Sequence, residues 1–291
     1  MSVGSVAVLG AGIMGRGIAY VSALGGYRTL LQDPQRAALD KAVADVDAQL
    51  ERGVAAGRVA DADAVAARRR LEAVASLEEA VRDADLVIEA VPEAIELKVE
   101  LFARLDRAAP ARAVLASNTS SLSLTEMAAA TSRAPQVAGM HFFNPVPRMK
   151  LLEIVRALET SEATLRTCAE VGARMGKECV VVRESPGFVT SRINAMIGNE
   201  AFYMLQEGVA SAEDIDKALK LGLNHPMGPF ELVDLVGLDT RLSILRFLHR
   251  TLGEKFRPCP LIEQYVAAGR LGRKSGRGVY EYPAVADTVA S

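Results

Sequence analysis

The sequence feature that most constrains the fold is a glycine pattern near the N-terminus. Residues Gly10–Gly15 have the sequence GAGIMG. Directly before it, Ser5–Leu9 is a short apolar stretch that predicts a buried strand. The helix predicted over Met14–Leu24 begins inside the pattern. GxGxxG is weak evidence alone, but the order of strand, glycine turn and helix indicates a dinucleotide-binding unit.

Each glycine of this pattern has a physical reason. Gly10 permits a tight turn, Gly12 lets the backbone approach a pyrophosphate, and Gly15 lets the helix pack close to the strand. The N–H groups and the dipole at the start of the helix then face the anion. We therefore expect the three glycines, with Ile13 and Met14 between them, to contact the cofactor.

An acidic residue, Asp33, ends the second predicted strand, which starts at Arg28 and lies beyond the first helix. A carboxylate at this position can accept hydrogen bonds from an adenosine ribose and would repel a 2′-phosphate. Arg36, three residues later, weakens this preference only slightly. The expected cofactor is therefore NAD rather than NADP.

Strand-like and helix-like segments alternate over residues 1–184. Pro34 opens a long helical region, Gln35–Arg70, which we expect to form a helical pair that projects from the core near residues 35–70. The alternation predicts an α/β fold with a Rossmann-like, doubly wound and mostly parallel sheet. Further strands are predicted at Leu86–Val91, Ala113–Ala116, Val137–Phe143, Leu151–Val155 and Cys179–Val182.

Strand signals stop near Ser185, Pro186 and Gly187. We therefore expect an NAD-binding domain over 1–184, an all-helical C-terminal domain over 185–283, and a frayed tail over 284–291. The helices of the second domain are predicted at Phe188–Glu207, Ala212–Leu221, Phe230–Leu235 and Leu238–Leu252.

Charge and hydropathy exclude several kinds of partner. Lys and Arg number 34 and Asp and Glu number 36, so no basic nucleic-acid-binding surface is expected. No uncharged apolar run reaches the roughly 18 residues that cross a bilayer. The N-terminus also lacks the basic and small-residue elements of a signal peptide. We expect a cytoplasmic protein that binds neither nucleic acid nor membrane.

The three cysteines, Cys168, Cys179 and Cys259, fit neither a zinc spacing nor a CxxC pattern. We expect them to be small core residues in a reducing compartment. No metal site is therefore expected.

The strongest catalytic signal is a histidine and a glutamate on neighbouring predicted strands. If these strands form a hairpin centred on Pro147, residues whose numbers sum to 294 face each other, which pairs His141 with Glu153. The carboxylate can then hold one imidazole nitrogen and favour protonation of the other, as a general base requires. A slip of one residue would bring Leu152 or Ile154 to that position instead.

Small hydroxyl residues, Ser117–Ser121, follow another predicted strand and include Ser120. Ligands bind at this end of the strands in such folds, so these side chains are candidates for the site. They could also cap the helix that starts near Leu124, although Ser123 or Thr125 could do the same.

Glu93 and Lys98 flank the start of the helix after LVIEAV, at the same crevice. A solvated ion pair on a helix explains these two residues equally well. Both interpretations stay open at this point.

Together these motifs resemble the 3-hydroxyacyl-CoA dehydrogenase family, and within it the short bacterial 3-hydroxybutyryl-CoA dehydrogenase type. The resemblance runs from about Val6 to Tyr282. HFFNP followed by Glu153 is far more specific than the glycine pattern. Other matching segments are GAGIMGRGIA, SNTSSL, SPGFVTSR, HPMGPFEL, VGLDT and GRKSGRGVYEY.

The resemblance implies an oxidoreductase with an NAD-binding domain and a helical C-terminal domain that forms a homodimer. The implied reaction is oxidation of an (S)-3-hydroxyacyl-CoA to the 3-ketoacyl-CoA, or the reverse, in fatty-acid and butanoate metabolism. The expected substrate has a short acyl chain, as in 3-hydroxybutyryl-CoA. His141 would be the base, Glu153 its partner, and Ser120 a contact of substrate and cofactor. Glu93, Lys98, Asn144 and Lys274 would line the dinucleotide site.

Two places depart from the family pattern. Ser191 stands where the family often has an Asn that helps to fix the catalytic site, and a serine cannot supply an amide's donor and acceptor together. Asn194, one helical turn later, could substitute. In the helix pair the family presents serine and lysine to CoA, whereas the basic candidates here are Arg52, Arg58 and Arg68–Arg70.

Two other functions fit parts of the pattern. A dehydrogenase of a non-CoA hydroxyacid, such as a sugar acid, shares these motifs, and only the CoA-binding helix pair would distinguish it. A non-catalytic NAD-binding protein predicts loss of the catalytic pair, but His141 and Glu153 are both present.

Overall fold

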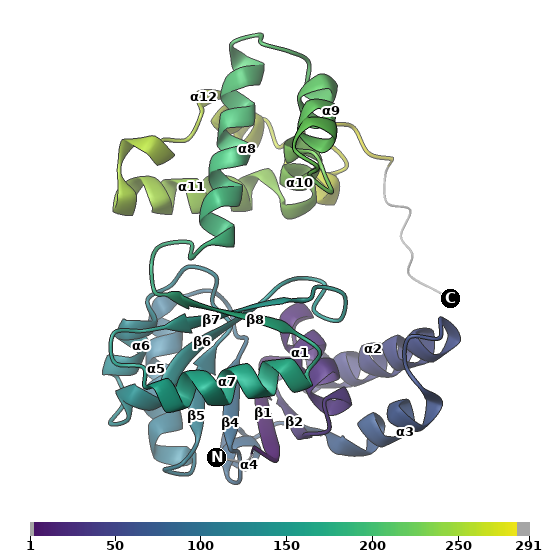
Figure 1. Ribbon diagram of the computed structural model, residues 1–291, viewed down its shortest axis with the longest axis vertical. Helices are drawn as coiled ribbons and strands as arrows, with labels where there is room; N and C mark the ends of the chain where they lie inside the picture. Colours follow the sequence, from purple (N-terminus) through teal and green to yellow (C-terminus); the bar gives the residue numbers. More distant parts are fainter. Residues whose placement is uncertain (1–2, 284–291) are drawn as a thin grey trace. The chain divides into compact units, whose positions relative to one another are not determined.

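The computed structural model describes residues 3–283. Within this range the chain divides into two compact units, with the division between Ser185 and Pro186. The N-terminal unit is built on a β-sheet and the C-terminal unit on helices (Figure 1).

Eight strands of the described residues form one sheet in the order β3-β2-β1-β4-β5-β6-β7-β8. All neighbouring strands are parallel except the antiparallel pair β6 and β7. The predicted doubly wound, mostly parallel sheet is therefore confirmed. The strands are β1 (Ser5–Leu9), β2 (Arg28–Gln32), β3 (Leu71–Val74), β4 (Leu86–Glu89), β5 (Val114–Ser117), β6 (Val137–Phe142), β7 (Leu151–Arg156) and β8 (Glu178–Arg183).

Helices cover both faces of this sheet, with α7 on one face and α5 and α6 on the other (Figure 1). Val6 and Val8 of β1 pack in the core on the α7 side, and Ala7 between them is also fully buried. Burial on both faces explains why the strands are almost continuously apolar. The helices are α1 (Ile13–Leu24), α2 (Arg36–Ala55), α3 (Asp61–Arg70), α4 (Leu77–Val81), α5 (Ile95–Ala108), α6 (Leu124–Ala129) and α7 (Glu162–Arg174).

The predicted helical pair is α2 and α3, which lie at the end of the sheet that holds β2 and β3 (Figure 1). Gly57 has a φ of 64° in the turn between them, a backbone conformation that favours glycine. Strand β3 follows α3 directly and was not predicted. Its four residues, LEAV, include a charge and are mostly only half-buried or exposed, so they give no apolar strand pattern.

The C-terminal unit has five α-helices among its described residues: α8 (Thr190–Gln206), α9 (Ala212–Gly222), α10 (Pro229–Val236), α11 (Leu238–Leu252) and α12 (Pro260–Ala267). Its core includes Phe202 and Phe230, whose rings meet edge to face. The predicted helical character of this unit is confirmed. Helix α12 was not predicted, because it is short and buries only Ile262.

Several features of the described chain bear on partners. Within residues 3–283 no helix is long and apolar enough to cross a membrane. In the same range no group of His, Cys, Asp or Glu side chains is arranged to hold a metal ion. All three cysteines are free thiols; Cys168 and Cys259 are buried and Cys179 is half-buried. The predicted tail, 284–291, lies outside the described residues.

Candidate active site

The glycine loop joins the end of β1 to the start of α1. Gly10 has a φ of 96°, and a Cβ atom there would lie 2.7 Å from the carbonyl oxygen of Ala90. A Cβ on Gly15 would lie 1.7 Å from the Gly10 carbonyl oxygen, so helix and turn pack too closely for any side chain. A Cβ on Gly12 would meet nothing within 4 Å, so this position opens on free space.

The start of α1 suits an anion. Gly12 is its N-cap and supplies no side-chain hydrogen bond to the first turn. The N–H groups and the dipole of the helix can therefore serve a phosphate. The cofactor contacts of Ile13 and Met14, which begin this helix, stay predictions.

Asp33 follows β2 and ties it to the glycine loop. Its Oδ2 accepts the N–H of Ala11 and its Oδ1 accepts the N–H of Gln35, both at 2.9 Å. Each carboxylate oxygen has a further lone pair, so the predicted ribose contact remains compatible with these bonds.

The hairpin of β6 and β7 places His141 opposite Glu153, so the predicted register is confirmed and a one-residue slip is excluded. His141 Nδ1 lies 2.8 Å from Glu153 Oε2. The Glu153 side chain is completely buried and that of His141 is 8% exposed. The imidazole also packs against Phe143, with ring centroids 4.4 Å apart. Its orientation is thus fixed by a charge-assisted hydrogen bond and a ring contact.

Asn144 is exposed in the loop that connects these strands. Lys177 fastens the loop, because its ammonium donates to the carbonyl oxygens of Val146 at 2.5 Å and of Met149 at 2.8 Å. Burial lowers the pKa of this lysine. The loop that follows His141 is thus held by the residue just before β8.

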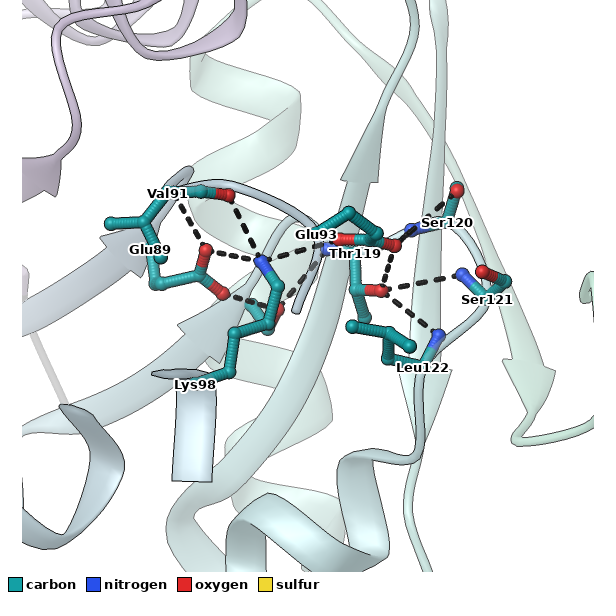
Figure 2. A network of polar contacts seen from close by, with 9 residues as sticks. Glu89, Val91, Glu93, Lys98, Thr119, Ser120, Ser121 and Leu122 are labelled. Atoms are coloured by element: carbon teal, nitrogen blue, oxygen red, sulfur yellow. Dashed lines mark hydrogen bonds and ion pairs between the residues drawn. The ribbon is translucent and has the colours of Figure 1, made fainter. Parts of the chain in front are cut away.

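Lys98 lies in a buried polar network that reaches the partly exposed Glu93, so the two residues do not form a simple solvated ion pair (Figure 2). The Lys98 side chain is 1% exposed, and its ammonium donates to Glu89, which is completely buried. It also lies 3.3 Å from both Glu93 Oε2 and the Val91 carbonyl oxygen. These three partners match the three N–H donors of an ammonium group, which favours a supporting role for Lys98 over direct cofactor contact.

Glu89 was not identified as a site residue from the sequence, although it is the one charged residue in the apolar segment LVIEAV. A carboxylate within a buried apolar strand must have hydrogen-bonding or charged partners. The partners could not be named, because Ser117 reaches Glu89 only when β4 and β5 pair.

The loop after β5 carries Ser120. Glu93 Oε1 accepts the N–H of Ser120 at 3.1 Å and also the hydroxyl of Thr119. Ser123 caps α6 through the N–H of Glu126, so the cap and the candidate site residue are different hydroxyls. Asn118 Oδ1 accepts the N–H of Phe142 at 2.9 Å and joins this loop to β6 beside His141.

Two predicted site residues belong to the C-terminal unit. Ser191 lies in the first turn of α8 and is half-buried, and Asn194 lies one turn later. Lys274 lies in a short 3₁₀ turn, where its ammonium is 2.7 Å from Asp239 Oδ2. Their roles at a catalytic site stay predictions.

A cleft of about 830 Å³ opens beside the helical pair of the N-terminal unit. Its basic lining residues come from α2, the turn after it, the 145–150 loop and the region of α7 and β8, and no carboxylate is among its described lining residues. The cleft therefore suits a polyanion. The basic residues are Arg52, Arg58, Arg148, Lys150, Arg174 and Lys177.

This geometry separates the basic candidates of the helical pair. Arg52 and Arg58 line the cleft. Arg68 instead pairs with Asp47 and Glu51, and Arg70 donates to a backbone carbonyl oxygen. Arg52 and Arg58 are thus the better candidates for an anionic ligand.

Known proteins share both units. Residues 5–185 match the 3-hydroxyacyl-CoA dehydrogenase, NAD binding domain, and residues 187–282 match the C-terminal domain of the same family. The chain belongs to the 3-hydroxyacyl-CoA dehydrogenase family. The resemblance in the sequence motifs is confirmed by these matches.

Relatives in this family match nearly the whole chain. A probable 3-hydroxybutyryl-CoA dehydrogenase of Bacillus subtilis (strain 168) is 47% identical over 97% of this chain and 98% of its own length. A 3-hydroxybutyryl-CoA dehydrogenase of Bradyrhizobium diazoefficiens is 45% identical over 95% of this chain and 94% of its own. The crystal structure of (S)-3-hydroxybutyryl-CoA dehydrogenase from Ralstonia eutropha has a TM-score of 0.94 and 43% identity, covering 97% of this chain and all of that one.

Proposed function

We propose that this protein catalyses the NAD-dependent oxidation of an (S)-3-hydroxyacyl-CoA to the 3-ketoacyl-CoA, and the reverse reaction, with short acyl chains such as 3-hydroxybutyryl. The observation that carries the proposal is the buried pair of His141 and Glu153, with 2.8 Å between Nδ1 and Oε2. The relatives named above as 3-hydroxybutyryl-CoA dehydrogenases support the substrate class.

The chemistry of the pair follows from its geometry. Because Nδ1 is bound to Glu153, proton transfer with the substrate hydroxyl falls to Nε2 of His141. The buried Glu153 carboxylate stabilises the imidazolium that forms. NAD, when bound, supplies the hydride acceptor for C3 of the substrate.

The residues around the pair suit the cofactor and the reacting oxygen. His141 lies near the carboxyl end of β6, and Ser120 lies beyond the carboxyl end of the neighbouring strand β5. Ligands bind at this edge in doubly wound sheets. We assign the glycine loop and Asp33 to the adenosine and pyrophosphate half, and Glu93 and Ser120 to the reacting half, with Asn144, Lys274 and Ser191 as further contacts.

The basic cleft supports a CoA substrate. The nucleotide part of CoA carries several phosphate charges, and a cleft lined by arginine and lysine without carboxylates attracts such a group. Arg52 and Arg58 are the side chains we assign to it. A sugar acid or another free hydroxyacid would not need this cleft, and a non-catalytic protein would not need the buried catalytic pair.

We also propose that the protein works in the cytoplasm as a homodimer formed through its C-terminal unit. Free thiols are typical of a reducing compartment. Exposed apolar side chains on α8, including Ile193 at 53%, support a subunit contact there. Analytical ultracentrifugation measures the assembly directly, and a monomer at micromolar concentration would contradict it.

The experiment that tests the reaction is NADH oxidation followed by absorbance. Acetoacetyl-CoA with NADH should turn over rapidly, whereas free acetoacetate with NADH, and acetoacetyl-CoA with NADPH, should turn over slowly. NADH binding without turnover of acetoacetyl-CoA would contradict the proposed activity.

A further inference from the structure

Glu89, the last residue of β4, is a buried carboxylate with no solvent contact. Its Oε1 accepts the Val91 N–H at 2.7 Å and the Lys98 ammonium, and its Oε2 accepts the Ser117 hydroxyl at 2.6 Å. A side chain so enclosed by protein donors is placed to act on a ligand through its neighbours rather than by touching it.

One path from Glu89 runs through Lys98 to Glu93 (Figure 2). Lys98 lies between the two carboxylates and is itself 1% exposed. Glu93, at the other end, is 40% exposed. The path therefore begins in the core and ends at a carboxylate that reaches solvent.

A second path runs through Ser117 into the loop after β5. The Ser117 hydroxyl accepts the N–H of Thr119 at 3.1 Å. Glu93 accepts the N–H of Ser120 at 3.1 Å from the other side. Both paths thus meet at the 119–120 segment, which is held between Glu89 and Glu93.

The position of this segment in the sheet indicates what it serves. A doubly wound sheet has two mononucleotide-binding halves, and β1 with its glycine loop belongs to the first. Strands β4 and β5 belong to the second half, so Glu93 and Ser120 face the nucleotide that carries the nicotinamide.

We propose that Glu89 is a positioning residue for the nicotinamide half of the cofactor site, acting through Lys98 on Glu93 and through Ser117 on the 119–120 segment. The inference rests on the proposed function, because it takes NAD as the ligand. It adds a residue that touches neither cofactor nor substrate.

The charge of Glu89 is the property that matters. In Glu89→Gln the shape is kept, but Lys98 loses one of its two carboxylate partners and turns to Glu93. Three donors, from Val91, Lys98 and Ser117, point at the two carboxylate oxygens of Glu89. A glutamine offers them only one acceptor oxygen, and its NH₂ group faces at least one of these donors. Glu93 is then drawn away from Ser120.

The first experiment compares two ligands of the same site. NADH affinity is measured by NADH fluorescence, and ADP affinity by displacement of NADH, so that only the cofactor site is observed. Glu89→Gln should weaken NADH binding by about tenfold, the loss of a charged hydrogen bond, and leave ADP binding unchanged. Equal weakening of both ligands, or no weakening of NADH, would overturn the proposal, because a general structural defect does not distinguish the two halves.

A matched control removes a carboxylate that lies outside the network. Glu78 on α4 is exposed and contacts no residue of the network. Its carboxylate accepts a hydrogen bond from Arg104 at 2.7 Å. Glu78→Gln should leave the affinities for NADH and ADP unchanged. If Glu89→Gln does not fold, the double variant Glu89→Gln/Lys98→Met removes both buried charges and should show the same selective loss.

A double-mutant cycle tests the path to Glu93. Glu89 acts through Glu93, so Glu93→Gln should weaken NADH binding much less in the Glu89→Gln background than in the unaltered protein. Additive losses would overturn the path. Failure of the unaltered protein to bind NADH would overturn both this inference and the proposed function, whereas NADH binding without acetoacetyl-CoA turnover would overturn only the latter.

Discussion

The imidazole of His141 is held by a carboxylate on one side and by the ring of Phe143 on another. Glu153 is completely buried, and a buried carboxylate without a partner would be costly. The histidine therefore stabilises the glutamate in the resting protein, and in the proposed reaction the glutamate stabilises the imidazolium. In the proposed function, the same hydrogen bond serves both folding and catalysis.

Replacing the base should slow the chemistry and spare the cofactor. His141→Gln should lower kcat by about 10³-fold, because general base catalysis is lost, while the Kd for NADH stays nearly unchanged. Steady-state kinetics and NADH fluorescence measure the two quantities. An unchanged kcat would contradict the assignment of the base.

Asp33 has a structural bond to the glycine loop and a predicted bond to the ribose. Asp33→Ala should raise the KM for NAD by about tenfold and that for NADP much less, because the 2′-phosphate loses a repulsive neighbour. Kinetics with both cofactors measure the difference. Equal changes would show that Asp33 acts only through the Ala11 N–H.

At the scale of one element, the two glycines at the start of α1 have different roles. Gly15 is required for packing, whereas Gly12 is expected to be required only for binding. Gly15→Ala places a Cβ against the Gly10 carbonyl oxygen and should lower the melting temperature and abolish NADH binding. Gly12→Ala meets open space at a φ of −68°, so it should keep the melting temperature and weaken only NADH binding. Thermal unfolding and NADH fluorescence on both variants make the comparison. A stable Gly15→Ala protein that binds NADH would contradict the close packing.

Helix α5 is tied to the segment after α6 by Asp106, which accepts the N–H of Ser132 and the guanidinium of Arg133, both at 2.8 Å. Burial alone would raise the pKa of Asp106, but these hydrogen bonds outweigh it and hold the pKa below its usual value. A carboxyl whose pKa is lower in the folded state stabilises the protein above its unfolded pKa. That stabilisation is lost as the pH falls through the folded pKa.

Asp106→Asn should therefore lower the free energy of unfolding by about 2 kcal/mol at neutral pH. The difference from the unaltered protein should hold down to about pH 4 and shrink below it. Urea unfolding across this range measures it. Asp40→Asn is the control, because Asp40 is exposed beside Arg36 and should change stability by less than about 0.5 kcal/mol. A difference that grows on acidification would contradict the sign.

At the scale of the whole molecule, we expect the basic cleft to distinguish a CoA thioester from a small free acid. Arg52→Ala/Arg58→Ala should raise the KM for acetoacetyl-CoA by about tenfold and leave the Kd for NADH unchanged. Arg68→Ala is the matched control, because Arg68 pairs with Asp47 and does not line the cleft. An unchanged KM in the double variant would move CoA binding away from the helical pair.

The sequence predicted the features that depend on local order. The glycine loop follows from strand, turn and helix, and the pairing of His141 with Glu153 follows from the twofold period of a hairpin. Glu89 and its partners could not be assembled in this way, because Ser117 and Lys98 come from different elements and meet only when the sheet forms. The arginines of the helical pair likewise could not be ranked from the sequence, because only the structure shows that Arg52 and Arg58 line the cleft.

The antiparallel pairing of β6 with β7 has a consequence for the evolution of such an enzyme. A parallel neighbour would need a crossover of a dozen or more residues, whereas the hairpin brings His141 and Glu153 together within thirteen consecutive residues. The proposed catalytic dyad is therefore inherited as one short, self-aligning segment. We expect a single insertion inside β7 to turn an apolar side chain toward the imidazole and to end catalysis in one step.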